Sequence, residues 1–128
     1  ADAMGVAAVL APKDKSVGIT STVEKTASGA ANVVPYISVT NLARTIRKLK
    51  NFGVWVVGMK QGVPKSVFGC DLRRGVAIVV GSEGKGLRRL TEETCDEIVG
   101  IPMFGSVESL NLSVAAGICL YEVNRQRL

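Results

Sequence analysis

Stretches of continuous apolar residues alternate along the chain with segments of helical periodicity. Two apolar runs, VWVVG at 54–58 and VAIVVG at 76–81, are rich in β-branched residues and show no polar alternation. This pattern is typical of parallel strands that are buried on both faces. Shorter runs predict further strands at 7–10, 36–39 and 97–101. Because helical segments separate these runs, the sequence predicts an α/β domain with a mostly parallel sheet flanked by helices.

The segments between the runs predict the helices and one loop. Thr40 can cap a helix over 41–51, and Gly53 can end it. The apolar residues of this helix share one face: Leu42, Ile46 and Leu49. We expect further helices at 23–28, at about 87–95, and from Ser109 to the end of the chain. The glycines, proline and charges of 60–75 predict a mobile loop.

The last helix is unusual because apolar residues cover nearly its whole circumference. Such a helix must be buried on most sides, by the core or by a partner subunit. Ser109 is its expected N-cap. Asn111, in the first turn, can satisfy the local backbone. Alternatively, Ser109 and Asn111 can present polar groups to a ligand at the helix N-terminus.

Composition limits the class of protein. With 128 residues, 47% of them hydrophobic, the chain is expected to form one domain over 1–128. It has no apolar run near the roughly 18 residues of a membrane span, so we expect no membrane contact. Three dispersed cysteines fit a reducing, cytoplasmic location. The absence of histidine excludes a Ser-His-Asp triad and argues against a zinc site, so we expect no metal.

Charge and the N-terminal residues add two expectations. The net charge of +5 suits a nucleic-acid partner, but an aromatic content of 5% argues against a base-stacking surface. The segment ADAMG at 1–5 has the pattern of a final helical turn that Gly5 ends. Because so short a helix is not stable alone, we expect the chain to be part of a longer protein.

Three of the predicted strands end in loops that suit a ligand. The runs at 54–58, 76–81 and 97–101 lead into GMKQG, GSEGKG and PMFGSVESLN. If the strands are neighbours, the loops form one pocket at their carboxyl ends. The second loop matches neither a P-loop, because Leu87 stands where the lysine should be, nor the GxGxxG fingerprint. A turn with no function would need the glycines but not Glu83.

Two motifs carry a family resemblance. IVVGSEGKGL at 78–87 is similar to a strand followed by G-x-E-x-x-G, and IPMFGSVESLNLSVAAGICLYE at 101–122 is similar to a long and specific IPM…SLN…LYE motif. Together they resemble the second and third motifs of the SpoU (TrmH) family of RNA ribose 2′-O-methyltransferases in the SPOUT superfamily. The resemblance covers essentially the whole chain. It is strongest to the branch that methylates a guanosine in 23S ribosomal RNA, and a tRNA guanosine enzyme is the nearest sibling.

The resemblance implies a fold, a cofactor and a set of site residues. Its fold is an α/β domain whose C-terminal segment threads a deep trefoil knot, and family members are homodimers. The knotted loops bind S-adenosylmethionine, largely through backbone groups. The matching cofactor positions are Gly81, Ile101 and Leu110, with Gly58 and Met103 as neighbours. The matching catalytic positions are Glu83, which orients other polar groups, and Ser109 and Asn111, which shape the cofactor and ribose site. Candidates for RNA phosphate contacts are Lys85, Arg88 and Arg89.

One departure from the family pattern bears on activity. A first motif, N-x-G-x-x-x-R, carries the catalytic asparagine and arginine, and it should lie just before 1–5. Because the sequence starts after that point, we expect these residues to bind cofactor but to methylate RNA poorly or not at all. The other classes that remain open are a non-catalytic RNA-binding module and a nucleotide-binding α/β domain. The missing loop lysine argues against the latter.

Overall fold

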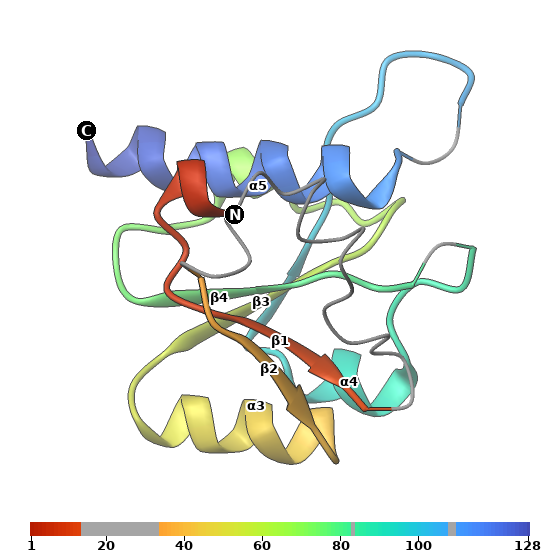
Figure 1. The fold of residues 1–128 in the computed structure, drawn as a ribbon. Coiled ribbons are helices and arrows are strands. Elements are labelled where there is room, and N and C mark those ends of the chain that lie inside the picture. Colours follow the sequence, from red (N-terminus) through yellow and green to blue (C-terminus); the bar gives the residue numbers. More distant parts are fainter. Residues whose placement is uncertain (14–33, 83, 108–109) are drawn as a thin grey trace, which may run out of the picture. The chain divides into compact units, whose positions relative to one another are not determined.

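The structure, a computed structural model, describes residues 1–13, 34–82, 84–107 and 110–128 (Figure 1). Its contacts form two compact units, Ala1–Thr45 and Ile46–Leu128. The strand pairs of both units are parallel, which confirms the α/β class with parallel sheets. A single domain over 1–128 stays a prediction. No helix of the described ranges is long and apolar enough to cross a membrane.

The first unit contains two parallel strands, β1 (Val9–Pro12) and β2 (Tyr36–Val39). The backbone N–H of Lys13 donates to the carbonyl of Val39 at 2.9 Å and extends their ladder. β2 has the predicted bounds, whereas β1 lies further along the chain than the predicted strand at 7–10. Ahead of β1, η1 (Asp2–Met4) is a short 3-10 turn. Gly5 follows it with a φ of 72°, as expected of a glycine that ends a helical turn.

The helix α3 (Leu42–Asn51) agrees with the predicted helix but not with its predicted cap. The backbone N–H of Arg44 donates to Oδ1 of Asn41 at 3.1 Å, so Asn41 and not Thr40 satisfies the first turn. Both residue types can cap a helix, and because the helix begins at Leu42, the cap position falls on Asn41. The helix ends where expected, because Gly53 has a left-handed φ of 86°.

The second unit contains a parallel sheet in the order β4-β3-β5. β3 (Trp55–Met59) is central, between β4 (Val76–Val79) and β5 (Glu97–Val99). These are the strands predicted at 54–58, 76–81 and 97–101, with small shifts at their ends. Between β4 and β5, α4 (Arg89–Thr94) forms the middle of the helix expected at about 87–95.

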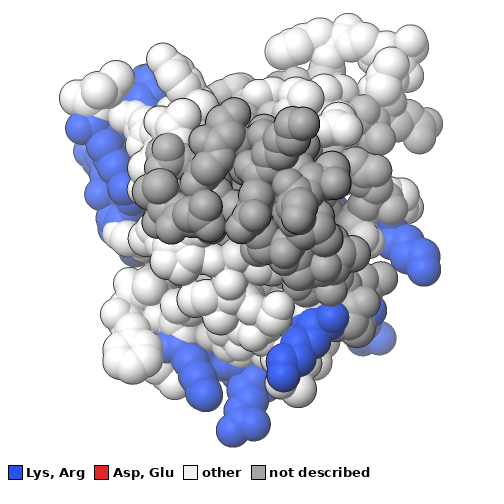
Figure 2. Space-filling model, in the orientation of Figure 1, with Lys and Arg blue, Asp and Glu red and all other residues white. Residues whose placement is uncertain are grey.

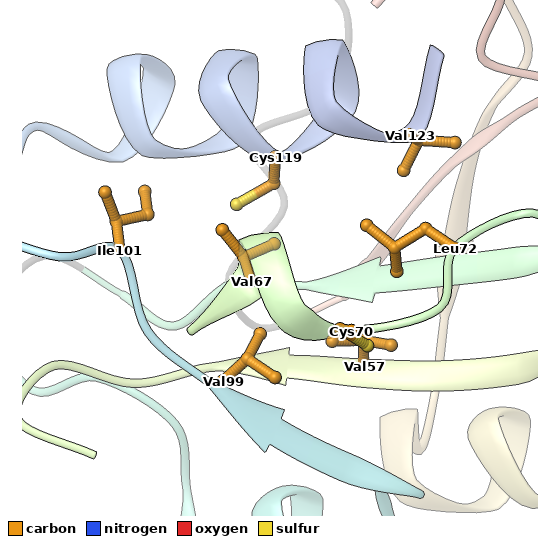
Figure 3. Close-up of a cluster of buried hydrophobic side chains, with 8 residues drawn as sticks. All are labelled: Val57, Val67, Cys70, Leu72, Val99, Ile101, Cys119 and Val123. Atoms are coloured by element: carbon orange, nitrogen blue, oxygen red, sulfur yellow. The ribbon is translucent and has the colours of Figure 1, made fainter. Parts of the chain in front are cut away.

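The core of the second unit lies between its sheet and α5 (Leu112–Arg127) (Figure 3). Cys119 and Val123 point from α5 toward a layer that includes Val67 of η2 (Val67–Gly69). Burial of these apolar side chains removes them from water, which is the main favourable contribution to folding. The buried cluster consists of Val57, Val67, Cys70, Leu72, Val99, Ile101, Cys119 and Val123.

The segment 60–75, expected to be a mobile loop, is anchored in this core. Val67 and Leu72 have no exposed surface. Gln126 of α5 binds the backbone on both sides of Asp71: its amide nitrogen donates to the carbonyl of Cys70 at 2.9 Å, and its Oε1 accepts from the N–H of Leu72 at 2.7 Å. The expectation of a mobile loop is therefore wrong for this part of the segment, because contacts from α5 fix it.

α5 begins later than predicted, and its N-cap is Asn111. Oδ1 of Asn111 accepts from the N–H of Ser113 at 2.8 Å and from that of Val114 at 3.4 Å. The prediction of Ser109 as the cap is wrong, because the helical hydrogen bonds start only after Asn111. Ser109 itself lies outside the described residues, as does the short helix expected at 23–28.

Within the described part of the chain, α5 is buried along one face and exposed on another. Cys119, Glu122 and Val123 are buried, whereas Val114 is 50% exposed and Tyr121 is 59% exposed. The predicted burial on most sides is therefore not met by the core alone. An exposed apolar surface on a helix of this kind is typical of a protein interface.

Candidate cofactor and RNA site

The carboxyl ends of three strands meet at one edge of the second unit's sheet. Gly58 of β3 lies opposite Val79 of β4 and Ile98 of β5. The segments that follow the strands therefore leave the sheet from one edge, on the right of Figure 1. The condition for a shared pocket, that these strands are neighbours, is confirmed. Edges of this kind are where parallel sheets bind ligands.

The loop after β4 is closed on itself. Ser82 and Gly86 exchange backbone hydrogen bonds of 3.2 and 2.9 Å, and Gly84 and Gly86 have left-handed φ angles of 82° and 67°. A Cβ on Gly81 would lie only 2.1 Å from the carbonyl carbon of Gly86. Glycine is therefore required at position 81 by the shape of the loop, which brings main-chain groups to the sheet edge. Glu83 lies outside the described residues, so its catalytic role stays a prediction.

Gly58 has a packing reason to be glycine. A Cβ at this position would lie 2.8 Å from Cδ1 of Ile98, 2.9 Å from Sγ of Cys95 and 3.0 Å from Cδ1 of Leu87. The missing side chain lets these residues approach β3 closely. A cofactor contact by Gly58 stays a prediction, and it would use the backbone.

The third segment, after β5, brings apolar residues to the same edge. Ile101 is buried, Met103 is half-buried, and Leu110 packs against the core cluster. Gly100 begins the segment, and a Cβ there would lie 2.8 Å from the carbonyl oxygen of Lys60. The predicted cofactor positions 58, 81 and 101 thus belong to three adjoining segments. Asn111 caps α5 through Oδ1, which leaves its amide NH₂ group outside the cap.

A small pocket lies beside this edge. Its volume is about 140 Å³, whereas pockets for small-molecule ligands usually have about 300 Å³ or more. It therefore has room for part of a cofactor only. The lining residues are Gly62, Val63, Pro64, Ser66, Gly100, Ile101 and Pro102.

The predicted RNA-contacting cations are exposed at this end of the unit. Lys85 lies in the closed loop, Arg88 is the N-cap residue of α4, and Arg89 begins that helix. Nε of Arg89 lies 3.0 Å from Oε1 of Glu93, an exposed pair on adjacent turns. Their exposure suits contacts with phosphate groups.

One ion pair at the carboxyl end of the sheet could not be predicted from the sequence. Nζ of Lys60 lies 2.8 Å from Oε1 of Glu92. Lys60 directly follows β3, and Glu92 lies in the first turn of α4. The position of Lys60 after the central strand was a signal that it could face the site, but nothing in the sequence indicated its partner.

A second polar cluster lies around Glu97 of β5. Oε2 of Glu97 accepts from Nε1 of Trp55 at 2.6 Å and from the thiol of Cys70 at 2.9 Å, and Oε1 accepts from Nζ of Lys65. The hydrogen bonds from Cys70 and Lys65 lower the pKa of Glu97 to about 2. Burial, together with the neighbouring Glu97 carboxylate, raises the pKa of the Cys70 thiol to about 12. This cluster ties the 60–75 segment to the sheet.

The three cysteines are not activated for chemistry. Burial is the main cause that raises the pKa of Cys95 and of Cys119 to about 11, and of Cys70 to about 12. Such thiols stay protonated at neutral pH, so they are poor nucleophiles and poor metal ligands. The described part of the chain holds no group of three or more His, Cys, Asp or Glu side chains that could bind a metal ion.

A family profile described as "SpoU rRNA Methylase family" matches residues 1–121. The chain belongs to the SpoU rRNA methylase family. This identification confirms the resemblance carried by the motifs at 78–87 and 101–122. The matched residues include both the closed glycine loop and the segment after β5, so both belong to the family's shared sequence.

Named SpoU relatives cover the whole of this chain. The 23S rRNA (guanosine-2′-O-)-methyltransferase RlmB of Ralstonia nicotianae is 60% identical over 127 residues, which are 99% of this chain and 51% of that protein. Its RlmB counterpart in Neisseria meningitidis serogroup B is 57% identical over 128 residues, again 51% of that protein. The chain therefore spans about half the length of the curated relatives it matches.

Solved structures of SpoU proteins share the fold. The SpoU methyltransferase AviRb from Streptomyces viridochromogenes, in complex with AdoMet, matches with a TM-score of 0.89 and 26% identity, over 98% of this chain and 49% of that one. The A. aeolicus TrmH/SpoU tRNA modifying enzyme matches with a TM-score of 0.87 and 31% identity, over 98% of this chain and 64% of that one. The parallel arrangement of the present sheets is thus the arrangement of the family.

Proposed function

We propose that this chain is the cofactor-binding part of an enzyme that transfers a methyl group from S-adenosylmethionine to the ribose 2′-hydroxyl of a guanosine in 23S ribosomal RNA. The observation that carries the proposal is the meeting of three strand ends at one sheet edge in a chain of the SpoU family. The 60% identity to an RlmB protein supports ribosomal RNA as the substrate. The 31% identity to a tRNA modifying enzyme supports tRNA as the second candidate.

The residues at this edge suit a cofactor with an adenosine part and a methionine part. Ile101, Met103 and Leu110 are apolar, and Gly58 and Gly81 bring main-chain groups to the ends of β3 and β4 beside them. These five residues would bind the cofactor. When bound, S-adenosylmethionine supplies a methyl group on a positively charged sulfur, which is already a good leaving group.

The remaining work of the chain is to place the ribose and to help remove the proton of its 2′-hydroxyl. No histidine is present to act as the base. We assign to Glu83 the orientation of neighbouring polar groups. Ser109 and the amide NH₂ group of Asn111 would shape the site where ribose and cofactor meet. The cations that would bind RNA phosphates are Lys85, Arg88 and Arg89.

The C-terminal half would form the deep trefoil knot of the SPOUT superfamily. The TM-score of 0.89 to the AviRb structure supports a shared chain path. A knot would hold the segments after β3, β4 and β5 together without a disulfide or a metal. We place the reaction in the cytoplasm, where ribosomal RNA of bacteria is processed.

A second copy of the chain would cover the exposed face of α5. A largely apolar groove of about 680 Å³ follows this face. Phe68, Val114 and Tyr121 border it, each at least half exposed. Exposed apolar surface of this kind supports a homodimer. Sedimentation analysis of the full-length protein should give a dimer, and Tyr121→Glu should give monomers. A monomeric parent protein would contradict the proposal.

Calorimetric titration of the full-length protein with S-adenosylmethionine tests the function. We expect one site per chain and competition by the demethylated product. Titration with ATP and NAD distinguishes the nucleotide-binding alternative. RNA binding without any cofactor binding would favour a non-catalytic RNA-binding module and would overturn the proposal.

A further inference from the structure

Lys60 lies at the middle of the sheet edge that the carboxyl ends of β4, β3 and β5 form. It is the first residue after the central strand β3, and its N–H donates to the carbonyl of Val99 at 2.9 Å. Its own carbonyl oxygen is so close to Gly100 that a Cβ there would lie 2.8 Å away. The backbone of Lys60 is therefore fixed by β5 and by the segment that follows it.

An ion pair directs the side chain of Lys60. Nζ lies 2.8 Å from Oε1 of Glu92, whose side chain is 28% exposed, against 52% for that of Lys60. The better-buried carboxylate thus sets where the ammonium group stands. An ammonium group has three donors, so one carboxylate oxygen leaves donors for another acceptor. Exposed ion pairs add little stability, and this pair defines where the ammonium group lies in the structure.

The surroundings of Lys60 favour an anionic partner. Lys85, Arg88 and Arg89 are exposed on the neighbouring loop and on α4, and the carboxylates on α4 are Glu92 and Glu93. The cations outnumber the carboxylates among these described residues. In Figure 2, Lys and Arg side chains lie on the left, lower and right parts of the face shown, and no Asp or Glu is seen there among the described residues.

We propose that Lys60 binds a phosphate group of the RNA backbone beside the methyl-transfer site. The proposal rests on the function proposed above and names a contact for that same site. A lysine ammonium is a point charge that suits phosphate, and phosphate contacts position a nucleic acid without reading its sequence. A positive charge fixed at the end of the central strand β3 would determine how closely the target ribose approaches the carboxyl ends of the strands.

The basic residues at the other end of the sheet are less suited to this role. Arg73 pairs with Asp71 at 3.0 Å, and Nε of Arg127 donates to the carbonyl of Leu72 at 3.3 Å. These contacts lie within the 70–75 segment and between that segment and α5, so they stabilise its conformation. They also lie where the strands begin, whereas parallel sheets bind ligands where strands end.

Three variants of the full-length protein test the proposal. Lys60→Met removes the charge, Lys60→Arg keeps it, and Lys48→Met removes an exposed charge of α3 as a matched control. The affinity for unmodified 23S ribosomal RNA is measured at several salt concentrations. We expect Lys60→Met to weaken binding several-fold and to lower the slope of log affinity against log salt by about 1, as for the loss of one phosphate contact. Lys60→Arg should bind like the parent.

Two further measurements separate the possible failures. Cofactor titration and thermal unfolding of Lys60→Met should match those of the parent, since neither depends on a phosphate contact. An unchanged RNA affinity and salt slope in Lys60→Met would overturn the role of Lys60 alone. An equal loss in Lys48→Met would also overturn it, because the effect would then come from net charge. A parent protein that binds cofactor but no RNA would overturn the proposed function and this contact together.

Discussion

Gly81 and Gly86 approach each other so closely that a Cβ on Gly81 would lie 2.1 Å from the carbonyl carbon of Gly86. No real side chain tolerates that distance, so the loop after β4 can close only around a glycine. The backbone hydrogen bonds between Ser82 and Gly86 depend on the same closure. The closed shape of the loop therefore depends on glycine at position 81.

Gly81→Ala should open this loop. We expect it to lower the free energy of unfolding by about 1–3 kcal/mol, as overpacking does. Affinity for S-adenosylmethionine should fall about tenfold or more, which corresponds to about 1.4 kcal/mol. Calorimetric titration and urea unfolding of the full-length protein measure the two effects. Gly75→Ala is the matched control, since a Cβ there would have no neighbour within 4 Å. Equal affinities for Gly81→Ala and the control would contradict the backbone contact.

Asn111 allows a structural role to be separated from a functional one. Asn111→Ala should cost about 1 kcal/mol of stability, because Oδ1 is lost from the N-cap of α5. Asn111→Asp keeps an acceptor and adds a negative charge that the helix N-terminus favours, so its stability should be retained. Both variants should lose methyl transfer if the amide NH₂ group serves the site. Full transfer by the stable Asn111→Asp variant would show that Asn111 is a cap and nothing more.

Glu97 should make stability depend on pH. Its pKa in the folded state, about 2, is below the ordinary value of 4.5. The stabilisation is therefore complete above pH 4.5 and is lost as the pH falls toward 2. Glu97→Gln should cost about 2 kcal/mol at pH 7, as for a hydrogen bond to a charged group. Urea unfolding at pH 7 and at pH 3 should show a smaller difference between variant and parent at the lower pH.

Asp71 provides the control for this prediction. Its pKa is also lowered to about 2, by hydrogen bonds from Arg73, but its side chain is 49% exposed. Solvent screens such a pair, so Asp71→Asn should change stability far less than Glu97→Gln. If the two variants lost equal stability, the Glu97 cluster would not anchor the 60–75 segment to the sheet.

The sequence was most informative where the physical cause is local. Continuous β-branched runs predicted β3 and β4, and the left-handed requirement at Gly53 predicted the end of α3. The motifs at 78–87 and 101–122 then led to the family. Runs of this kind predict strands because a strand buried on both faces has no polar positions to offer water.

The sequence was least informative where two residues compete or where contacts are distant. Thr40 and Asn41 can both cap a helix, and in the structure Asn41 does so. The anchoring of the 60–75 segment depends on Gln126, and the direction of Lys60 depends on Glu92. Neither pairing leaves a periodic or compositional trace. Glu83 and Ser109 lie outside the described residues, so their roles rest on the family motifs.

Methyl transfer to RNA by the full-length protein is the decisive measurement for the proposed function. Total RNA from cells that lack the protein, which includes ribosomal RNA and tRNA, is incubated with S-adenosylmethionine that carries a deuterated methyl group, and the nucleosides are mapped by mass spectrometry. We predict one deuterated 2′-O-methylguanosine in 23S ribosomal RNA, formed only with the intact protein. A label found on a base, on tRNA alone, or on no RNA at all would contradict it.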